Sequence, residues 1–264
     1  MDAGKNRFAK YSTGIAGFIT AVLMSFILFV GAAYIALYID SNYYEREYIK
    51  YSVVEAMPVE ITMSEVDGIM AVSNHMMDFL IHGDKPEDLQ IAVTINGETR
   101  DFFTEREIAH MADVRNLFKY SINLFFLLSA LVVIINIISW KTIYKIIPSD
   151  YLKNIGLGIT SGTLFIIAAI GILTAVICSN FSTAFIKFHH IFFDNDLWLL
   201  DPFEDLMINM LPESFFADTA LRIVLLYAVF MLLMLIFGIF LYKKTSNSSA
   251  QLAVSVRSDQ AKRF

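Results

Sequence analysis

Four long runs of apolar residues constrain what this chain can fold into more than any other feature. The runs are Ile15–Ile39, Ser121–Trp140, Ile155–Cys178 and Ala220–Tyr242. Each reaches the roughly 20 residues that an α-helix needs to cross about 30 Å of hydrocarbon. The first run is also much longer than the apolar region of about 7–15 residues in a signal peptide, so we interpret it as a retained span. We therefore predict an α-helical integral membrane protein with four transmembrane helices.

Basic residues are concentrated in three of the segments between and beyond these runs. They are Lys5, Arg7, Lys10, Lys141, Lys145, Lys153, Lys243, Lys244, Arg257, Lys262 and Arg263. Basic loops stay on the cytoplasmic side of a membrane. We therefore predict that residues 1–14, 141–154 and 243–264 are cytoplasmic, and that residues 40–120 and 179–219 are extracellular. The protein would be a multi-pass protein of the plasma membrane with both termini in the cytoplasm.

The two predicted extracellular segments hold almost all the acidic residues of a chain whose net charge is −6. An acidic face repels the phosphate backbone of nucleic acids. Nucleic acid is therefore excluded as a partner of this face.

The spans themselves indicate close packing of helices and not transport. The only charge in them is Arg222, at the outer end of the fourth span, where its side chain can extend to the interface. Gly158 and Gly162 have the spacing that lets two helices approach closely. Asn136, in the second span, has the chemistry for a hydrogen bond between helices.

The last segment, residues 243–264, differs in composition from the spans. From Thr245 onward it is polar and rich in serine. Such a composition buries too little apolar surface to fold, so we predict a disordered tail.

The first extracellular segment is, at about 80 residues, too long for an unstructured connection. Ser64 has the character of an N-cap, and the apolar residues after it have helical spacing up to Gly83. Alternating residues in Leu89–Ile95 and Glu98–Phe102 flank Asn96-Gly97, the preferred pair for a tight hairpin turn. We predict a small mixed α/β extracellular cap.

Six tyrosines lie at the end of the first span and just beyond it, at Tyr34, Tyr38, Tyr43, Tyr44, Tyr48 and Tyr51. Tyrosine is enriched where a membrane meets water. We interpret the six as an interfacial aromatic belt, with a contribution to a lipid-facing pocket as the alternative.

A first histidine segment begins with Thr104 and Glu107, which form a capping box. The helix it opens has no breaker before the second span. A rise of 1.5 Å per residue places His110 about 15 Å above the start of the apolar run. Glu107 and Asp113 are three residues away on either side, so either carboxylate could set which ring nitrogen is protonated.

A second histidine segment, Lys187–Phe216, is too charged for a span and unusually aromatic. The residues that share one face at helical spacing are Phe181, Phe185, Phe188, His189 and Phe192. His190 would point to the opposite side. Beyond them, Asp201-Pro202 predicts a turn, and residues 203–211 predict a short amphipathic helix lying on the interface.

The chain lacks the local motifs of serine hydrolases, phosphate-binding loops and zinc proteases. We therefore predict no cofactor and no metal ion. Two histidines at one membrane face can act as general acid and base, moving a proton from an attacking amine to a departing alkoxide. An α-amine has a pKa of about 7.7–8.0, so an imidazole with a pKa of about 6.5 can deprotonate it at modest cost.

These residues resemble the motifs of a known family, the lipoprotein intramolecular transacylases (Lit) of Gram-positive bacteria. The first motif comprises Glu107, His110, Met111, Asp113 and Val114. The second, more specific motif comprises Phe188, His189, Ile191, Phe192 and Phe193, followed by Trp198, Asp201, Pro202, Leu211, Pro212, Glu213, Phe215 and Phe216. The resemblance covers most of Phe8–Tyr242, including four spans and an outer cap.

The resemblance implies an acyltransferase that moves the sn-2 acyl chain of a diacylglyceryl group to the α-amine of a lipoprotein's N-terminal cysteine. The product is a lyso-form lipoprotein, and the partners are a diacylglyceryl-modified lipoprotein and membrane lipid. It further implies that His110 and His189 are catalytic. The expected supporting residues are Glu107, Asp113, Trp198 and Asp201, and the expected substrate pocket includes Phe188, Phe192 and Phe193.

Two alternatives stay open at this point. One is a non-enzymatic membrane protein whose extracellular cap binds a partner. The other is a metal-dependent membrane hydrolase in which His110 and His189 share a metal ion with Asp194 or Asp201.

Overall fold

The computed structural model describes residues 3–57, 65–95 and 97–261. The chain divides into two compact units. We call Met1–Ala32, Phe125–Ala175 and Val224–Phe264 the helix unit, and Ala33–Leu124 with Val176–Ile223 the cap unit. Each is described by itself.

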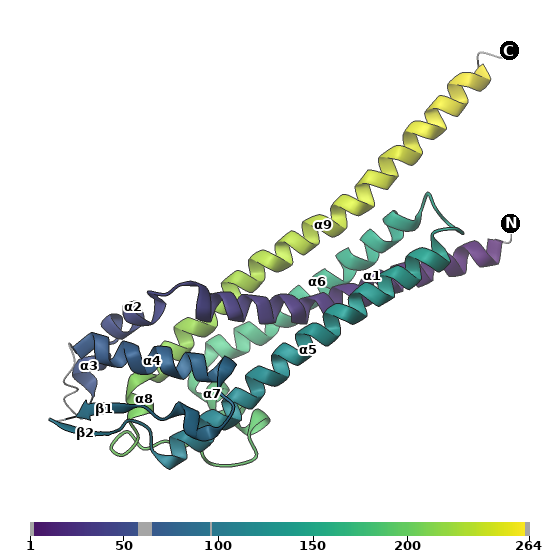
Figure 1. The fold of residues 1–264 in the computed structure, drawn as a ribbon. Helices are drawn as coiled ribbons and strands as arrows, with labels where there is room; N and C mark the ends of the chain where they lie inside the picture. The colour runs from purple at the N-terminus through teal and green to yellow at the C-terminus, as the bar shows by residue number, and fades with distance from the viewer. Residues whose placement is uncertain (1–2, 58–64, 96, 262–264) are drawn as a thin grey trace. The chain divides into compact units, whose positions relative to one another are not determined.

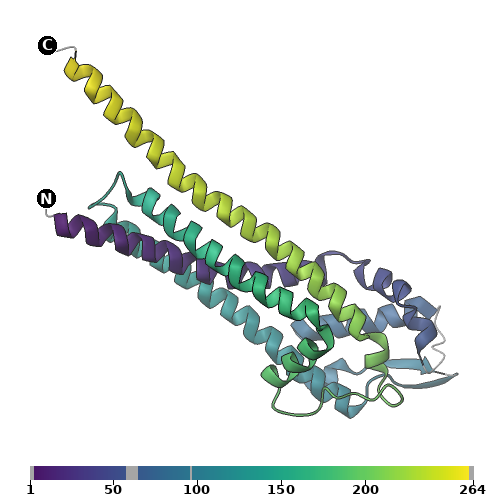
Figure 2. The same cartoon turned by 180° about the vertical axis from the view of Figure 1, so that it is seen from behind.

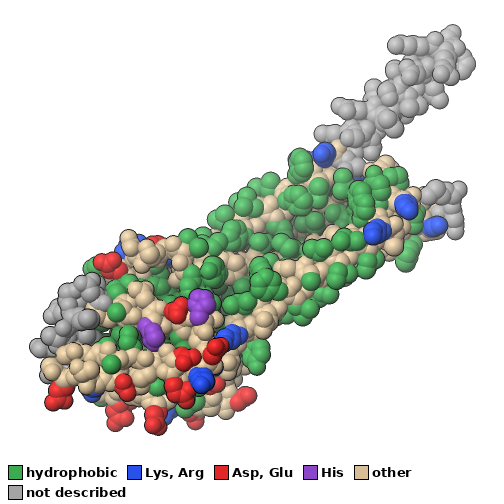
Figure 3. Space-filling view, in the orientation of Figure 1, with side chains coloured by type: hydrophobic (Ala, Val, Ile, Leu, Met, Phe, Trp, Pro, Cys, Tyr) green, Lys and Arg blue, Asp and Glu red, His purple; other side chains and the backbone are tan. Residues whose placement is uncertain are grey.

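The helix unit is built from stretches of four long helices, which are α1 (Ala3–Tyr34), α5 (Glu105–Ile143), α6 (Tyr151–Ser179) and α9 (Glu213–Ala261). Within this unit they run side by side in both views (Figures 1 and 2). Four helices of the described chain are long and apolar enough to cross a membrane. Apolar side chains cover most of the face of this unit that Figure 3 shows, as lipid contact requires. The prediction of four apolar helices is confirmed.

Glycines on α6 let its neighbours in the helix unit approach closely. A Cβ atom on Gly162 would lie 2.8 Å from Cβ of Ala21 on α1. A Cβ atom on Gly156 would lie 2.7 Å from the carbonyl oxygen of Gly238 on α9. Helix α6 therefore packs against both α1 and α9, which confirms the close packing predicted from the glycine spacing.

The cap unit is a small mixed α/β structure. Its elements are η1 (Ile35–Ile39), a π-helix, then α2 (Tyr43–Lys50), α3 (Val53–Ala56), α4 (Glu65–His82), the 3-10 helix η2 (Pro86–Leu89), β1 (Ala92–Ile95), β2 (Glu98–Asp101), α7 (Phe181–Phe192) and α8 (Leu206–Met210). The first turns of α5 and α9 complete it. The predicted small sheet is present.

The hairpin and α4 follow the sequence pattern closely. Strands β1 and β2 are antiparallel, with Ile95 opposite Glu98 at the turn. Gly97 has a φ of 82°, a conformation that glycine adopts without strain. Helix α4 ends at His82, and Gly83 N donates a hydrogen bond to Phe79 O. The proposed N-cap Ser64 and the first turn residue Asn96 lie outside the described residues.

The prediction of an interfacial tyrosine belt is wrong for Tyr43, Tyr44 and Tyr48, which are buried in the core of the cap. The hydroxyl groups of Tyr48 and Ser73 are 2.5 Å apart, which ties α2 to α4. Tyr44 and Tyr48 contact α4, and Phe215 of α9 packs against all three tyrosine rings. Spacing along the chain could not show that these partners exist.

Two other local predictions need correction. The predicted helix over residues 203–211 is shorter, and Leu206, Met207 and Met210 of α8 are buried in the cap core instead of lying on an interface. The predicted disordered tail is also wrong for residues 245–261, where α9 continues as a helix. No glycine or proline follows Gly238 to interrupt it.

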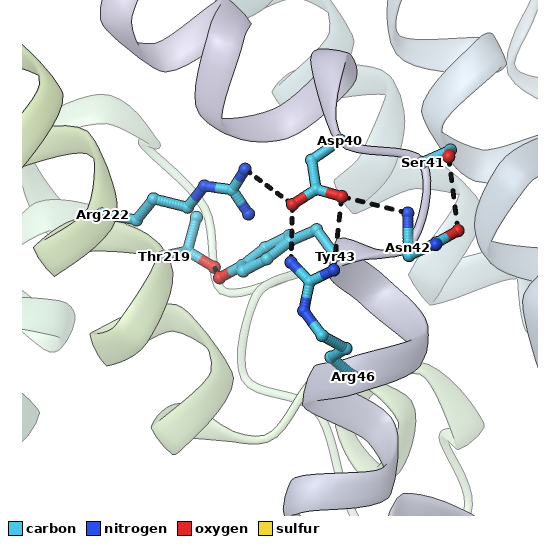
Figure 4. A network of polar contacts seen from close by, with 7 residues as sticks. All are labelled: Asp40, Ser41, Asn42, Tyr43, Arg46, Thr219 and Arg222. Atoms are coloured by element: carbon cyan, nitrogen blue, oxygen red, sulfur yellow. Dashed lines mark hydrogen bonds and ion pairs between the residues drawn. The ribbon is translucent and has the colours of Figure 1, made fainter.

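Arg222 has a protein partner in the cap unit (Figure 4). Its Nη2 atom is 3.1 Å from Oδ2 of Asp40, which also accepts from Arg46 at 2.5 Å. Its guanidinium lies over the ring of Tyr43, 4.2 Å from the centroid. Tyr43 in turn shares a 2.7 Å hydrogen bond with Thr219. This network joins the end of η1, the start of α2 and the first turns of α9.

Replacing Gly158 with leucine should lower the melting temperature of the detergent-solubilised protein. A Cβ atom at this position would lie 2.8 Å from the backbone nitrogen of Phe18 on α1. Overpacking of this kind costs about 1–3 kcal/mol. Gly171→Leu, on the same helix, is the control, because nothing lies within 4 Å of a Cβ atom there. Equal melting temperatures for the two variants would contradict the close packing of α1 and α6.

Candidate active site

The helix that carries His110 is anchored by its first turn. Thr104 N donates to Oε2 of Glu107 at 2.7 Å, and Glu107 N donates to Oγ1 of Thr104 at 3.2 Å. Both halves of the predicted capping box are therefore present. His110 follows within one turn of Glu107. The helix that carries His189, α7, is capped by Asn180, whose side-chain oxygen accepts from Thr183 N at 2.9 Å.

The cap unit brings the two histidines together. The ring centroids of His110 and His189 are 6.0 Å apart, with 35° between the ring planes. Each residue is only 7% exposed. His190, next to His189 in the chain, is exposed. His189 is the buried member of this neighbouring pair, although the ring of exposed His190 also contacts Trp198 edge-on at 5.2 Å.

Aromatic rings enclose the histidine pair. Phe193 contacts both rings, at 5.2 Å from His110 and 5.7 Å from His189. Trp198 stacks on His189 at 4.8 Å. Phe188 touches His189 edge-on at 5.6 Å. The pair therefore lies in largely apolar surroundings.

Two further phenylalanines of α7, Phe192 and Phe185, differ in how closely they approach the histidine pair. Phe192 is 50% exposed, and its only ring contact among the described residues is with Phe188. Phe185, which is not among the expected site residues, has its ring 4.4 Å from that of His189. Its position four residues before His189 on the same helical face was the signal that could have identified it.

A backbone carbonyl sets the tautomer of His189. Its Nδ1 atom lies 2.8 Å from Phe185 O. A carbonyl oxygen only accepts, so Nδ1 carries the proton and donates it. In the neutral ring, Nε2 is then the atom with a free lone pair. His110 has a buried Nδ1 atom for which the described residues provide no hydrogen-bond partner.

Burial keeps both imidazoles neutral. It lowers the pKa of His110 to about 4, assisted by the nearby His189 and opposed by Asp113. His110 precedes the predicted span, which begins at Ser121. Burial also lowers the pKa of His189, although its hydrogen bond to Phe185 O acts in the opposite direction. Neutral rings at pH 7 can accept protons, as a general base must.

The sequence suggested that Glu107 could orient His110, but its hydrogen bonds go to other groups. Its side chain is completely buried, and its two oxygens accept from Thr104 N and, at 2.6 Å, from Met207 N. Neighbouring Asp205, which sequence analysis missed, accepts from Oγ1 of Thr104 at 2.9 Å and from Asp201 N at 2.8 Å. Glu107 therefore fastens the start of α8 to the first turn of α5.

Asp113 likewise binds the loop and not the imidazole. It accepts from Nδ2 of Asn195 at 2.9 Å, while Arg106 donates to the carbonyl oxygen of Asp196. Asp201 closes a turn by accepting from Phe203 N at 2.9 Å. Helix α5 thus holds the start of the loop that carries Trp198, and Thr104 and Glu107 hold the segment that follows it. The indole Nε1 of Trp198 is buried and has no hydrogen-bond partner among the described residues.

Comparison with known proteins identifies the family. Residues 18–216, which include both histidine segments, match the family described as lipoprotein intramolecular transacylase Lit. This chain belongs to the Lit family. Membership makes it a membrane-integral acyltransferase, and the family acts on lipoproteins. No curated protein matches the chain.

Solved structures of Lit from Bacillus cereus share the fold. One is 20% identical, with a TM-score of 0.62, and the match covers 93% of this chain and 99% of that one. A variant with one histidine replaced by arginine is 21% identical, with a TM-score of 0.60 and coverage of 92% and 94%. A variant with a histidine replaced by alanine gives 21% identity, a TM-score of 0.57 and coverage of 91% and 95%.

The carboxylates considered for a metal site do not gather with the histidines. Among the described residues, no group of three or more His, Cys, Asp or Glu side chains is placed to hold a metal ion. Asp194 is exposed, and Asp201 is engaged in its turn. His82, elsewhere in the cap, pairs with Asp78 at 2.7 Å on the surface.

Replacing Glu107 with glutamine should destabilise the cap. The amide group would face one of the two backbone N–H donors that Glu107 binds, which leaves a buried donor unpaired at a cost of about 1–3 kcal/mol. Glu105→Gln, in the same turn but exposed, is the matched control. Thermal unfolding of the purified variants measures the effect. If the two variants have the same melting temperature, Glu107 does not have the anchoring role assigned to it.

The histidine pair should make stability depend on pH below 6.5, the usual histidine pKa. Above that pH both folded and unfolded chains carry neutral rings, so burial adds no pH dependence. Between pH 6.5 and about 4, the unfolded chain takes up a proton that folded His110 does not, so the free energy of unfolding falls as pH falls. NMR of ¹³C-labelled histidine, assigned with single variants, should show His110 titrating near 4 and His189 below 6.5. Titration of either ring at or above 6.5 would rule out the neutral pair.

Proposed function

We propose that this protein transfers the sn-2 acyl chain of a diacylglyceryl-modified N-terminal cysteine to the α-amine of the same cysteine. The product is the lyso-form of the lipoprotein. Membership of the Lit family supports the reaction class. The observation that carries the residue assignment is the buried pair of neutral imidazoles, His110 and His189, with ring centroids 6.0 Å apart.

The reaction forms one C–N bond and breaks one C–O bond. The amine nitrogen attacks the ester carbonyl carbon, and the tetrahedral intermediate collapses with loss of the glyceryl oxygen. The nitrogen gives up a proton, and the departing oxygen gains one. No redox change or further reactant is needed, so the protein has to position the groups and move a proton.

In our proposal His189 is the base and His110 delivers the proton. His189 donates its Nδ1–H to Phe185 O, so Nε2 is the atom that can accept a proton from the attacking amine. His110, which can donate from one ring nitrogen and accept at the other, protonates the glyceryl oxygen. It then recovers a proton from His189, and both rings end the turnover neutral.

The aromatic enclosure favours transfer over hydrolysis. Water entering the site would compete with the amine for the ester and release a free fatty acid. Phe193 and Trp198 pack on the imidazoles and keep that volume apolar. Because amine and ester belong to one substrate molecule, their effective concentration can reach about 10⁵–10⁸ M once the substrate is folded into place. The pocket therefore acts by excluding water and holding the substrate in a reactive geometry.

We further propose that the cap unit faces the outside of the plasma membrane and that both termini are cytoplasmic. The distribution of charge supports this orientation. Acidic side chains gather over the cap unit in Figure 3, whereas residues 1–14, 141–154 and 243–264 are rich in Lys and Arg. The active site would then meet lipoproteins in the outer leaflet.

Replacing either His110 or His189 with alanine should abolish acyl transfer, since general acid or base catalysis contributes about 10²–10⁴-fold. His190→Ala is the matched control, because His190 is adjacent in sequence but exposed. The purified protein is incubated with a diacylglyceryl lipopeptide that has a free N-terminal amine. Fragmentation in the mass spectrometer locates the acyl chain, because the total mass of the lipopeptide does not change.

Three results would contradict parts of this scheme. Full transfer by His110→Ala or His189→Ala would reject the two-histidine mechanism. Equal losses in all three alanine variants would show that the effect is not specific to the buried pair. An acyl chain that stays on the glyceryl group with folded wild-type protein would reject the reaction itself.

A further inference from the structure

The helix unit contains a cavity whose lining includes neither histidine of the candidate site. Its volume is about 440 Å³, and its walls come from α1, α5, α6 and α9. Most of the lining is apolar, including Met24, Val132, Ile155, Met234 and Leu241. All of these residues belong to the helix unit, whereas both histidines belong to the cap unit. The reaction proposed above does not use this cavity.

We propose that the cavity binds an acyl chain of an anionic glycerophospholipid whose phosphate lies among the lysines at its mouth. Two features beyond apolar character support this occupant. One is a polar group inside the cavity that lacks a partner for its proton. The other is the strong positive charge beside one end of the cavity.

The polar group is the hydroxyl of Thr20. Asn136 Nδ2 donates to Thr20 Oγ1 at 3.0 Å and to Val132 O at 2.8 Å. Thr13 and Thr163, elsewhere in the helix unit, donate their hydroxyl protons to the carbonyl four residues earlier. Within the described residues Thr20 shows no such acceptor. A buried donor left unpaired costs about 1–3 kcal/mol, and the ester carbonyl of a lipid would satisfy it.

The positive charge lies where Trp140, Tyr151 and Leu152 line the cavity. Lys141 follows Trp140, and Lys153 follows Leu152. The Nζ atom of Lys153 also lies over the ring of Tyr242, 5.7 Å from its centroid. Tyr242 directly follows Leu241, which lines the cavity. Lysine and arginine side chains are visible at this end of the helix unit in Figure 3.

Little negative charge offsets these lysines. Between α5 and α6, Asp150 is the one acidic residue, and it is already paired with Lys10 at 2.6 Å. Basic clefts between transmembrane helices attract anionic head groups, with each lysine contributing about 1 kcal/mol near the surface. A zwitterionic lipid would fit the same apolar volume but would not gain this attraction. The lysines therefore favour an anionic head group, and the apolar cavity accommodates an acyl chain.

The test measures lipid binding by the full-length protein. Native mass spectrometry compares phosphatidylglycerol with phosphatidylcholine, both carrying the same palmitoyl and oleoyl chains. The wild-type protein should retain the phosphatidylglycerol in preference, by about fivefold for each lysine that contacts the phosphate. Equal retention of the two lipids by wild-type protein would overturn the proposal, and this comparison needs no variant.

Two matched pairs of variants locate the site. Val132→Phe fills the cavity and should reduce phosphatidylglycerol binding about tenfold or more, because excluded methylenes lose their burial. Val133→Phe, one residue along α5 and 56% exposed, should leave binding unchanged. Lys153→Gln should lower the preference for phosphatidylglycerol more than Lys145→Gln does, because Lys153 directly follows the lining residue Leu152. Identical binding by the two phenylalanine variants would place the lipid elsewhere and reject the cavity as its site.

Discussion

The cap of this protein depends on the carboxylate of Glu107, which is completely buried in the first turn of α5. One oxygen completes the capping box with Thr104, and the other holds Met207 N at the start of α8. A buried carboxylate is unfavourable unless strong donors satisfy it, and two backbone N–H groups do so here. This bond links the helix of His110 to the segment that follows Trp198. Glu107 thus holds together the two segments that flank the candidate site.

Burial has two consequences for the histidine pair that act together. It lowers the pKa of both rings, which keeps them unprotonated and able to accept a proton. In the proposed reaction, burial would also limit the entry of water, which would otherwise hydrolyse the ester before its acyl chain reached the amine. A more exposed pair would be more basic but would admit the competing nucleophile. The rings of Phe193 and Trp198 therefore serve both purposes through one physical effect.

Local signals in the sequence predicted elements well where all the interacting groups lie close in the chain. The capping box of Thr104 and Glu107 and the hairpin around Gly97 are of this kind. The helical spacing of Phe185 and His189 also placed the catalytic candidate on the correct face. Predictions failed where the partner is distant in the chain. Tyr48 is buried because α4 covers it, and Glu107 binds Met207 and not His110.

By itself, the sequence determined the class of this protein. Four apolar runs require helices in a membrane, since only such segments satisfy their backbone without water, and the motifs around His110 and His189 point to the Lit family. Only the tertiary structure decided how the site is built. It placed the histidine rings 6.0 Å apart, assigned the proton of His189 to the nitrogen facing Phe185 O, and made Glu107 an anchor. These outcomes depend on contacts between segments far apart in the chain, which local spacing does not encode.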